Sequence, residues 1–396
     1  MIIGNPLMVG KDPPHYNGSY SISPTTAEQV LPVQGKLMDE NLVIGSYSAG
    51  TVDGMGSYLK AWAEGNLEEL IDESGLISQI ADYAFYSYGQ LYKASFPAAI
   101  NIGAYAFACC SGLRRIYASN ATRIGDRAFI SCTNLKEVSM PEVGTVGNYA
   151  FYQCYSLESV VLTKANMIYP FAFNLCSNIN RISLPSATYV YSCAFSGCIH
   201  LSEVSLPICR VVEYNAFYSC TELASISLPE ALSVGNNAFY GCTNLREAYM
   251  PSLVIIGTSV FQGDIALRSV YMPRLSIVQQ YMFNGCANLE NVTFDAVSAI
   301  YSYAFSGCSK LASVTFPVLS FISNYAFMNC VTLKSLYLLS TSRVSLMYSS
   351  VFQNTPMLNS GLTGSFGSIY VPSSLYDSYL SYGYWSWFAS RFVAIT

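Results

Sequence analysis

The chain has 396 residues, of which 52% are hydrophobic and only 11% are charged, with a net charge of −5. This balance excludes an intrinsically disordered chain and a nucleic-acid-binding protein of the usual basic kind. No run of about 18 or more apolar residues occurs, so we expect no membrane-spanning helix and no insertion into a membrane.

Residues 1–50 begin without the basic segment and apolar run of a secretory signal. Within them, residues 20–44 are predicted to form two short strands around a turn. The same segment is similar to a pattern in tail-associated proteins of phages and prophages of Gram-positive bacteria. This resemblance implies that residues 1–50 attach the chain to other virion proteins, and that the protein leaves the cell by lysis. The segment departs from the pattern at Val33, where threonine is usual, and matches it at Ile22, Pro24, Gln29, Leu31, Gly35, Lys36, Met38, Asn41 and Ile44.

Residues 51–80 are predicted to form an N-terminal cap. A short helix is expected at the start of the segment 58–85, which then leads into the first coil of a repeat array. The paired carboxylates Glu68–Glu69 and Asp72–Glu73 lie in this cap, where they fit a solvated face better than the two opposed acids of a glycosidase.

From residue 81 to residue 345 the sequence repeats with a period of 22, in the frame I/V-G-x-x-A-F-x-x-C-x-x-L-x-x-V/I-x-L/M-P. A unit this short cannot bury its own apolar positions, so neighbouring units must stack as a solenoid. The segment L-x-x-V-x-L-P alternates like a strand, and Pro ends it. The Gly is expected to adopt a positive φ at a tight corner. The repeated phenylalanines are Phe85, Phe107, Phe129, Phe151, Phe173, Phe195, Phe217, Phe239, Phe261, Phe283, Phe305 and Phe327, with a further copy at Phe352.

This frame resembles the leucine-rich repeats of the BspA-like type over about residues 70–372. Such repeats are found in bacterial surface proteins and in some phage proteins. The resemblance implies a β-rich solenoid of about 13 coils, with a parallel sheet on one face and a cap at each end. It also implies an adhesin or interaction scaffold, and it carries over no catalytic residue.

Ten of the thirteen cysteines lie three residues after the Phe and are predicted to form an internal file of free thiols. A metal site is a weaker alternative, because it would need C-x-x-C pairs or nearby His. Disulfides between coils are also a weaker alternative, because they would need side chains closer than the ~4.8 Å between coils. Asp264 replaces Cys in one coil, where its carboxylate must accept backbone N–H groups or lie near solvent. Cys109, Cys193 and Cys209 are off the file, and we expect them to be exposed. The file comprises Cys110, Cys132, Cys154, Cys176, Cys198, Cys220, Cys242, Cys286, Cys308 and Cys330.

Other candidate chemistry is sparse. The two histidines, His15 and His200, lie in different regions and are expected at the surface, so a Ser–His–Asp or Cys–His site is hard to assemble. Residues 4–11 resemble a phosphate-binding loop only superficially, because its spacing is absent. We therefore predict no catalytic residue, no metal site and no cofactor.

Residues eight and ten after each Phe are expected to face outward from the strand. Tyr249 and Tyr271 are adjacent at the second of these positions, with charged residues beside them, and could bind a protein or a glycan. The alternative is that outward tyrosines simply suit a β-surface. Tyrosines two before or one after the Phe lie on another face, and the sequence does not decide between the faces. The candidate surface comprises Tyr117, Arg246, Glu247, Tyr249, Arg268, Tyr271 and Tyr337.

Residues 346–396 are predicted to contain the last coil and a C-terminal cap. The segment 367–395 reads as a strand followed by a Ser-led helix rich in Tyr and Trp, and Trp385 and Phe388 are expected to cover the last open coil.

Two functions follow from these features. The first is a non-enzymatic adhesion protein of a phage or prophage virion, which recognises a protein or glycan on a host surface. The second is a bacterial cell-surface adhesin or interaction scaffold whose leader and anchor lie outside this sequence. In either case the chain would be extracellular, it binds no nucleic acid, and a homo-oligomer is possible.

Overall fold

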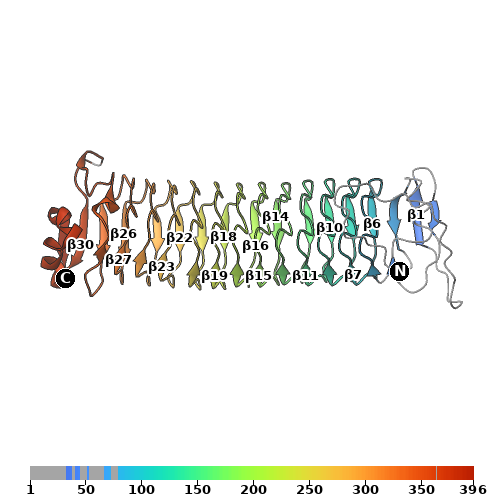
Figure 1. Cartoon of the computed structure of the whole chain (residues 1–396), viewed down its shortest axis with the longest axis horizontal. Helices are drawn as coiled ribbons and strands as arrows, with labels where there is room; N and C mark the ends of the chain where they lie inside the picture. The colour runs from blue at the N-terminus through green and yellow to red at the C-terminus, as the bar shows by residue number, and fades with distance from the viewer. Residues whose placement is uncertain (1–32, 38–40, 45–50, 53–66, 73–78, 363) are drawn as a thin grey trace. The chain divides into compact units, whose positions relative to one another are not determined.

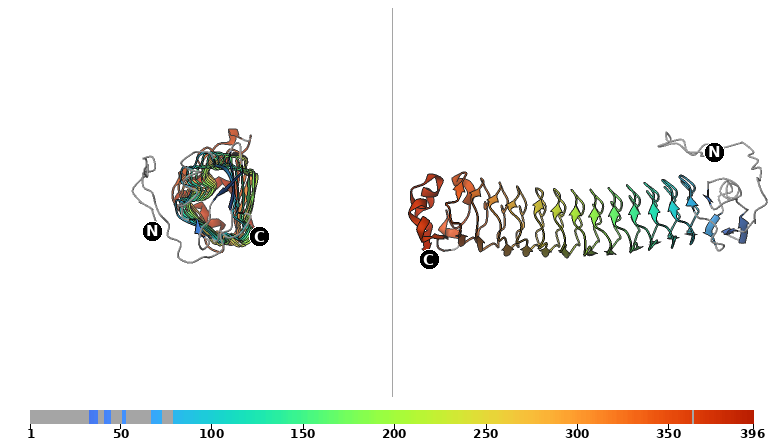
Figure 2. Two further views of the ribbon diagram at one scale, coloured as in Figure 1. Left: turned by 90° about the vertical axis from the view of Figure 1, so that its right-hand side faces the viewer. Right: turned by 90° about the horizontal axis from the view of Figure 1, so that it is seen from below.

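The computed structural model describes residues 33–37, 41–44, 51–52, 67–72, 79–362 and 364–396. The chain is a parallel β-solenoid of about 14 turns with repeats of ~22 residues, which confirms the predicted fold. It comprises two compact units, residues 1–165 and 166–396, and within each unit successive coils stack on one another (Figure 1). Each regular coil has a longer strand on one face and a two-residue strand on another. The end-on view in Figure 2 shows that the strands lie on separate faces of the coil.

In the unit of residues 1–165, the longer strands form one sheet in the order β12-β10-β8-β6-β4-β1-β2. β1 pairs antiparallel with both β2 and β4, so a hairpin extends the sheet beyond the parallel strands of the coils. The longer strands are β1 (Val33–Leu37), β2 (Asn41–Ile44), β4 (Leu67–Ile71), β6 (Lys93–Ser95), β8 (Arg115–Tyr117), β10 (Glu137–Ser139) and β12 (Ser159–Val161). The short strands are β3 (Thr51–Val52), β5 (Gln79–Ile80), β7 (Asn101–Ile102), β9 (Arg123–Ile124) and β11 (Thr145–Val146).

The hairpin of β1 and β2 confirms the two strands predicted within residues 20–44. Residues 20–32 and 38–40, which include much of the phage-like pattern, lie outside the described residues, as does the start of segment 58–85 where a helix is expected. The predicted division into an attachment segment, two caps and a solenoid stays a prediction.

In the unit of residues 166–396, parallel strands also form coils with two strand-bearing faces. The longer strands are β14 (Arg181–Ser183), β16 (Glu203–Ser205), β18 (Ser225–Ser227), β20 (Glu247–Tyr249), β22 (Ser269–Tyr271), β24 (Asn291–Thr293), β26 (Ser313–Phe316), β28 (Ser335–Leu338), β30 (Ser368–Pro372) and β31 (Phe392–Ile395). The short strands are β13 (Met167–Ile168), β15 (Tyr189–Val190), β17 (Val211–Val212), β19 (Ser233–Val234), β21 (Ile255–Ile256), β23 (Ile277–Val278), β25 (Ala299–Ile300), β27 (Phe321–Ile322) and β29 (Ser345–Leu346).

The core is built from files of identical side chains, one from each coil. The repeated phenylalanines are buried and stack on their neighbours, as Phe107 does on Phe129 with ring centroids 5.2 Å apart. The preceding Ala is also buried, and the N–H of Phe107 donates to the carbonyl oxygen of Ala128 in the next coil at 2.7 Å. Because successive described coils within each unit repeat these contacts, the turn segments satisfy their backbone groups between coils as the strands do.

The corner glycines are required for space and not for a positive φ, contrary to the expectation from sequence. A Cβ at Gly257 would lie 2.3 Å from the backbone nitrogen of Asn236 in the preceding coil, and one at Gly235 would lie 2.5 Å from that of Tyr214. Neither glycine has a positive φ. The left-handed residues lie two before and two after the Phe, and most of them are not glycine.

The last coil is covered as predicted. Trp385 and Phe388 are buried against Phe352, and the indole N–H of Trp385 donates to the carbonyl oxygen of Val344 at 2.7 Å. β31 adds a parallel strand to β30, which the sequence pattern does not reveal. The helical turns of this region are η1 (Ser349–Phe352), η2 (Ser360–Leu362), η3 (Ser373–Leu375), α2 (Tyr376–Leu380) and η4 (Gly383–Arg391).

Candidate functional site

The candidate surface lies on the face that carries the longer strands. Along β18, the side chains of Ser225 and Ser227 are exposed and that of Ile226 between them is buried. This alternation follows from the two-residue period of a strand. Residues eight and ten after the Phe therefore face outward, and the character of this face is set by those two positions in each coil.

Tyr249 in β20 and Tyr271 in β22 form a stacked pair on this face. The strand register places them side by side, their ring centroids are 5.3 Å apart, and the ring planes differ by 10°. The two residues are 46% and 40% exposed, so they present an aromatic surface to solvent. Such stacking contributes about 0.5–1.5 kcal/mol and limits the rotation of both rings. A ligand therefore meets rings that are already ordered.

Three exposed charged residues lie in, or directly before, the strands that carry the tyrosine pair. Arg246 and Arg268 are neighbours, because the N–H of Arg268 donates to the carbonyl oxygen of Arg246 at 2.8 Å. Glu247 is flanked in register by serines, whereas Glu203 lies opposite Arg181 and forms an ion pair at 3.4 Å. Within the described residues, Arg246, Glu247 and Arg268 form no ion pair. Their donors and acceptors are available to a ligand.

The other two candidate tyrosines do not join this pair. Tyr337 in β28 stacks on Tyr370 in β30, with centroids 4.3 Å apart, and both are half-buried. Tyr117 in β8 belongs to the unit of residues 1–165, and burial, followed by its contact with Glu137, raises the pKa of its hydroxyl. The predicted surface omits Tyr370. The alternating pattern of the strand at 368–372 places Tyr370 at the outward position, and that signal could have identified it.

A second set of aromatic side chains lies on the turn segments that contain the Phe. The guanidinium of Arg127 lies between two tyrosine rings, 5.5 Å from the centroid of Tyr105 and 4.9 Å from that of Tyr149. All three residues adopt a positive φ, which is strained for residues with large side chains. Stacked pairs with centroids 4.8–5.1 Å apart are Tyr83–Tyr105, Tyr218–Tyr240, Tyr281–Tyr303 and Tyr303–Tyr325.

The structure places the ten-cysteine file in the core as fully buried free thiols. The thiol of Cys220 donates to the carbonyl oxygen of Phe195 in the preceding coil, with Sγ 3.2 Å from the oxygen. Burial raises the pKa of the Cys198 thiol to about 12, so this group is protonated at neutral pH and can donate. The same donation, at 2.9–3.3 Å, is made by Cys110, Cys132, Cys154, Cys198, Cys242, Cys286, Cys308 and Cys330.

The expectation for the other cysteines is wrong in two of three cases. Cys193 and Cys209 are buried, and Cys109 is half-buried. Cys209 follows the Pro turn at the position that Ala187 and Ala231 occupy in neighbouring coils, and this position points into the core. The repeat frame, when extended past the Pro, locates Cys209 in the core.

Asp264 is buried and lacks the partners that we expected for a carboxylate. Its exposure is 0%, and neither carboxyl oxygen has a hydrogen-bond partner. Burial raises the pKa of this carboxyl well above its usual value, and the nearby backbone groups of Cys242 and Gly241 offset only part of that effect. The raised pKa favours the protonated, neutral form of this side chain in the file. The carboxyl is buried because of its position in the repeat, since the equivalent residues of the neighbouring coils are buried as well.

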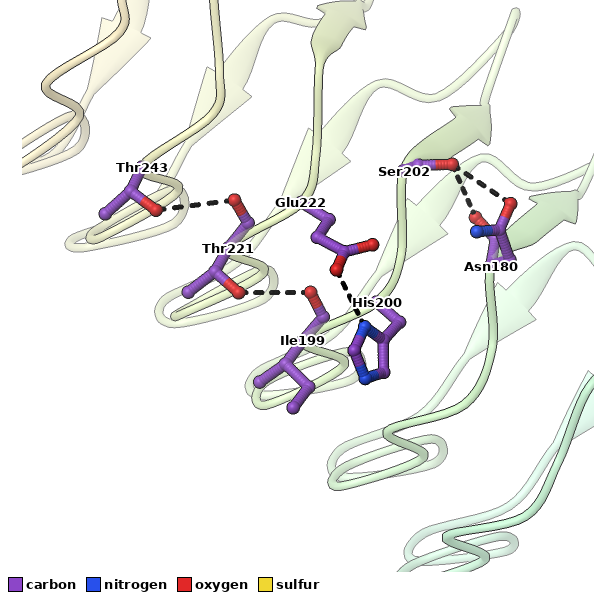
Figure 3. A network of polar contacts seen from close by, with 7 residues as sticks. All are labelled: Asn180, Ile199, His200, Ser202, Thr221, Glu222 and Thr243. Atoms are coloured by element: carbon purple, nitrogen blue, oxygen red, sulfur yellow. Dashed lines mark hydrogen bonds and ion pairs between the residues drawn. The ribbon is translucent and has the colours of Figure 1, made fainter.

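His200 lies at an exposed edge of the coils of residues 166–396. Its Nδ1 is 2.8 Å from Oε1 of Glu222 in the next coil (Figure 3). The hydroxyl of Thr221 donates to the carbonyl oxygen of Ile199 at 3.1 Å in the same row of loop contacts. His200 is thus a surface residue, as expected, and His15 lies outside the described residues.

Neither a metal cluster nor a membrane span is found among the described residues. They contain no group of three or more His, Cys, Asp or Glu side chains that could hold a metal ion. No helix in this part of the chain is both long enough and apolar enough to cross a membrane.

Comparison with known sequences identifies the repeat. The family model described as "BspA type Leucine rich repeat region (6 copies)" matches residues 59–167, 166–277 and 254–372. No curated protein matches the sequence. The family match begins at residue 59, and nothing in the comparisons supports the resemblance of residues 20–44 to phage tail proteins.

Comparison with solved structures gives the same fold. A leucine-rich repeat protein from Bacteroides ovatus is 21% identical, with a TM-score of 0.56 over 83% of this chain and 95% of that chain. A leucine rich cell surface protein from Faecalibacterium prausnitzii is 22% identical, with a TM-score of 0.34 over 66% of this chain and 82% of that chain. The pneumococcal vaccine antigen PcpA is 16% identical, with a TM-score of 0.41 over 92% of this chain and 86% of that chain.

Proposed function

The chain belongs to the BspA-type leucine-rich repeat family, and we propose that it is a non-enzymatic adhesion protein of a bacterial cell surface. Proteins of this repeat family are typically binding proteins without enzymatic activity. The proposed binding surface is the face of the longer strands, which repeats in every coil and offers a target many parallel contacts.

The stacked pair of Tyr249 and Tyr271 is the observation that carries this proposal. Binding sites are enriched in tyrosine because its large, rigid ring contributes contact area with little loss of conformational entropy. The sheet would hold the two rings in register, and the neighbouring coils contribute mainly small hydroxyl side chains at the same position. The pair also leaves apolar ring area in contact with water, which is a feature of binding surfaces.

The alternative role, in which residues 1–50 attach the chain to a phage particle, has less support. The family match begins beyond this segment. The strands that are described in it, β1 and β2, extend the sheet of the first coils through the antiparallel pairing of β1 with β4. We therefore assign these strands to the sheet and place the function at a cell surface.

The test is binding of the full, fluorescently labelled chain to bacterial envelopes and to cultured animal cells. We expect saturable binding to at least one of these surfaces, and a loss of about tenfold or more in affinity for the Tyr249→Ser/Tyr271→Ser variant. The matched control is Tyr218→Ser/Tyr240→Ser, which removes a stacked pair with centroids 5.0 Å apart from another face. Absence of saturable binding to every surface would contradict the proposal.

A further inference from the structure

We infer that Tyr249 and Tyr271 bind an uncharged glycan chain, with sugar rings packed against the outer faces of the two tyrosine rings. This inference rests on the proposed function, and it names the chemistry of the ligand that the same surface binds. One face of a pyranose ring presents a row of C–H groups, which pack favourably against the electron-rich face of an aromatic ring.

The coils on both sides of the pair leave room for such rings. In register with Tyr249 lies Ser227, and in register with Tyr271 lies Thr293. The next coils outward carry Ser205 and Thr315 at the same position. Coils are ~4.8 Å apart, so on its outer side each tyrosine is followed by two coils, or ~10 Å of surface, that carry only short side chains at this position. A sugar ring fits in a space of this width.

The polar groups around the pair suit hydroxyl groups better than a charged ligand. A sugar hydroxyl both donates and accepts a hydrogen bond, so it is best recognised where donors and acceptors lie together. The guanidinium groups of Arg246 and Arg268 supply donors, and the carboxylate of Glu247 supplies acceptors. Glu290 follows Arg268 in the next coil, as the 3.0 Å bond from its N–H to the Arg268 carbonyl oxygen shows. Two positive and two negative side chains therefore balance, and no net field selects an anion.

The surroundings also favour a glycan over a protein. The energetically important residues of a protein interface are usually ringed by contacts that exclude water from them. On this face the coils before and after the tyrosine pair expose mainly serine, threonine and asparagine side chains, as in β18, β24 and the outward positions of β26. Such a surface remains hydrated, and it supplies further hydrogen bonds to sugar hydroxyls, directly or through water.

The experiment is calorimetric titration of the full chain with four uncharged hexasaccharides: cellohexaose, maltohexaose, mannohexaose and N-acetylchitohexaose. We expect at least one to bind, and Tyr249→Ala or Tyr271→Ala to reduce its affinity about tenfold or more. The control variant Tyr218→Ala/Tyr240→Ala should bind within about twofold of the unaltered chain. Circular dichroism spectra should be the same for all variants, since the substituted side chains are at least partly exposed.

The inference and the proposed function fail in different ways. If no hexasaccharide binds, or if the double variant Tyr249→Ala/Tyr271→Ala binds as well as the unaltered chain, the inference is wrong. If the chain binds none of the four hexasaccharides, still binds cells after periodate has cleaved the vicinal diols of their glycans, and loses that binding in the double variant, the target is a protein and only the inference is wrong. If neither cells nor hexasaccharides are bound, both are wrong.

Discussion

Replacing Asp264 with asparagine should remove a pH dependence of stability that the buried carboxyl imposes on its coil. The carboxyl is fully buried and without partners, and its pKa in the folded chain is raised well above its usual value. The acids nearest to it, Cys242 and Cys286, are buried thiols whose own pKa values are raised by burial, so they stay neutral in acidic and neutral solution. Asp264 is therefore the group in this file that titrates first.

The sign and the magnitude follow from proton linkage. In the unfolded chain the carboxyl ionises at a pKa of about 3.9, whereas in the folded chain it keeps its proton to higher pH. Stability from this group is complete below the unfolded pKa and is lost as the pH rises toward the folded pKa. While the folded carboxyl remains protonated and the unfolded one is ionised, each pH unit costs about 1.4 kcal/mol, so two such units cost at most about 2.7 kcal/mol.

The assay is urea unfolding between pH 4.5 and pH 6.5, combined with hydrogen exchange of peptides from residues 240–290. The free energy of unfolding of the unaltered chain should fall relative to that of Asp264→Asn by about 1.4 kcal/mol per pH unit. Asp264→Cys should lose the same slope and gain stability, because a thiol there can donate to the carbonyl of Phe239 as other thiols of the file do. Asp295→Asn, which removes an exposed carboxylate, is the control. Parallel pH curves for Asp264→Asn and the unaltered chain would refute the reasoning.

Three further substitutions test the packing of the coils. Cys220→Ser and Cys220→Ala should each lower the free energy of unfolding in urea by about 1–2 kcal/mol. The loss for serine should be no larger than that for alanine, because a hydroxyl can still donate to the carbonyl oxygen that the thiol contacts. A clearly larger loss for serine would contradict this. Trp385→Ala should lower the free energy of unfolding by about 3–5 kcal/mol and lower the melting temperature. Trp387 is 69% exposed, so Trp387→Ala should change stability by less than about 0.5 kcal/mol. Equal melting temperatures for the two variants would be inconsistent with a covering role for Trp385. Gly257→Ala should lower the free energy of unfolding by about 1–3 kcal/mol. A Cβ at Gly144 would have no neighbour closer than 3.8 Å, so Gly144→Ala should be nearly neutral. Equal effects of the two substitutions would exclude the close approach of the backbone as the reason for glycine at the corner.

The repeat makes most of the fold predictable from sequence, because one physical constraint recurs in every coil. A residue that is buried in one coil is buried in the next, so the period of Phe and the alternation around Ile226 identify core and surface together. The same logic places Trp385 at the end of the array, where a large apolar side chain must cover the last Phe. The β31 strand has no counterpart in the repeat, and periodicity therefore cannot reveal it.

The details that sequence reasoning misses depend on contacts between coils, which a pattern along the chain does not contain. A glycine at a corner suggests a positive φ, but Gly257 is needed because the backbone of the preceding coil approaches it. The left-handed residues instead include Tyr105 and Tyr149, whose side chains give no sequence signal for that conformation. Burying Asp264 without partners costs less for the protonated acid than for the charged carboxylate, and the repeat pattern does not show which form the position holds. The sequence predicts that Tyr249 and Tyr271 are neighbours, but it does not predict that their rings stack.

The bonds between coils have a consequence for how such a gene can change in length. The N–H of Phe107 donates to Ala128 one coil ahead, and the thiol of Cys132 donates to Phe107 one coil behind. Duplication or loss of one whole repeat within a unit therefore leaves each of these groups opposite an equivalent partner, whereas an insertion of another length leaves some without one. Unequal recombination between repeats would add or remove coils one at a time without a new folding problem. The number of coils, and with it the length of the exposed strand face, can thus vary between descendants while the cross-section of the coil stays the same.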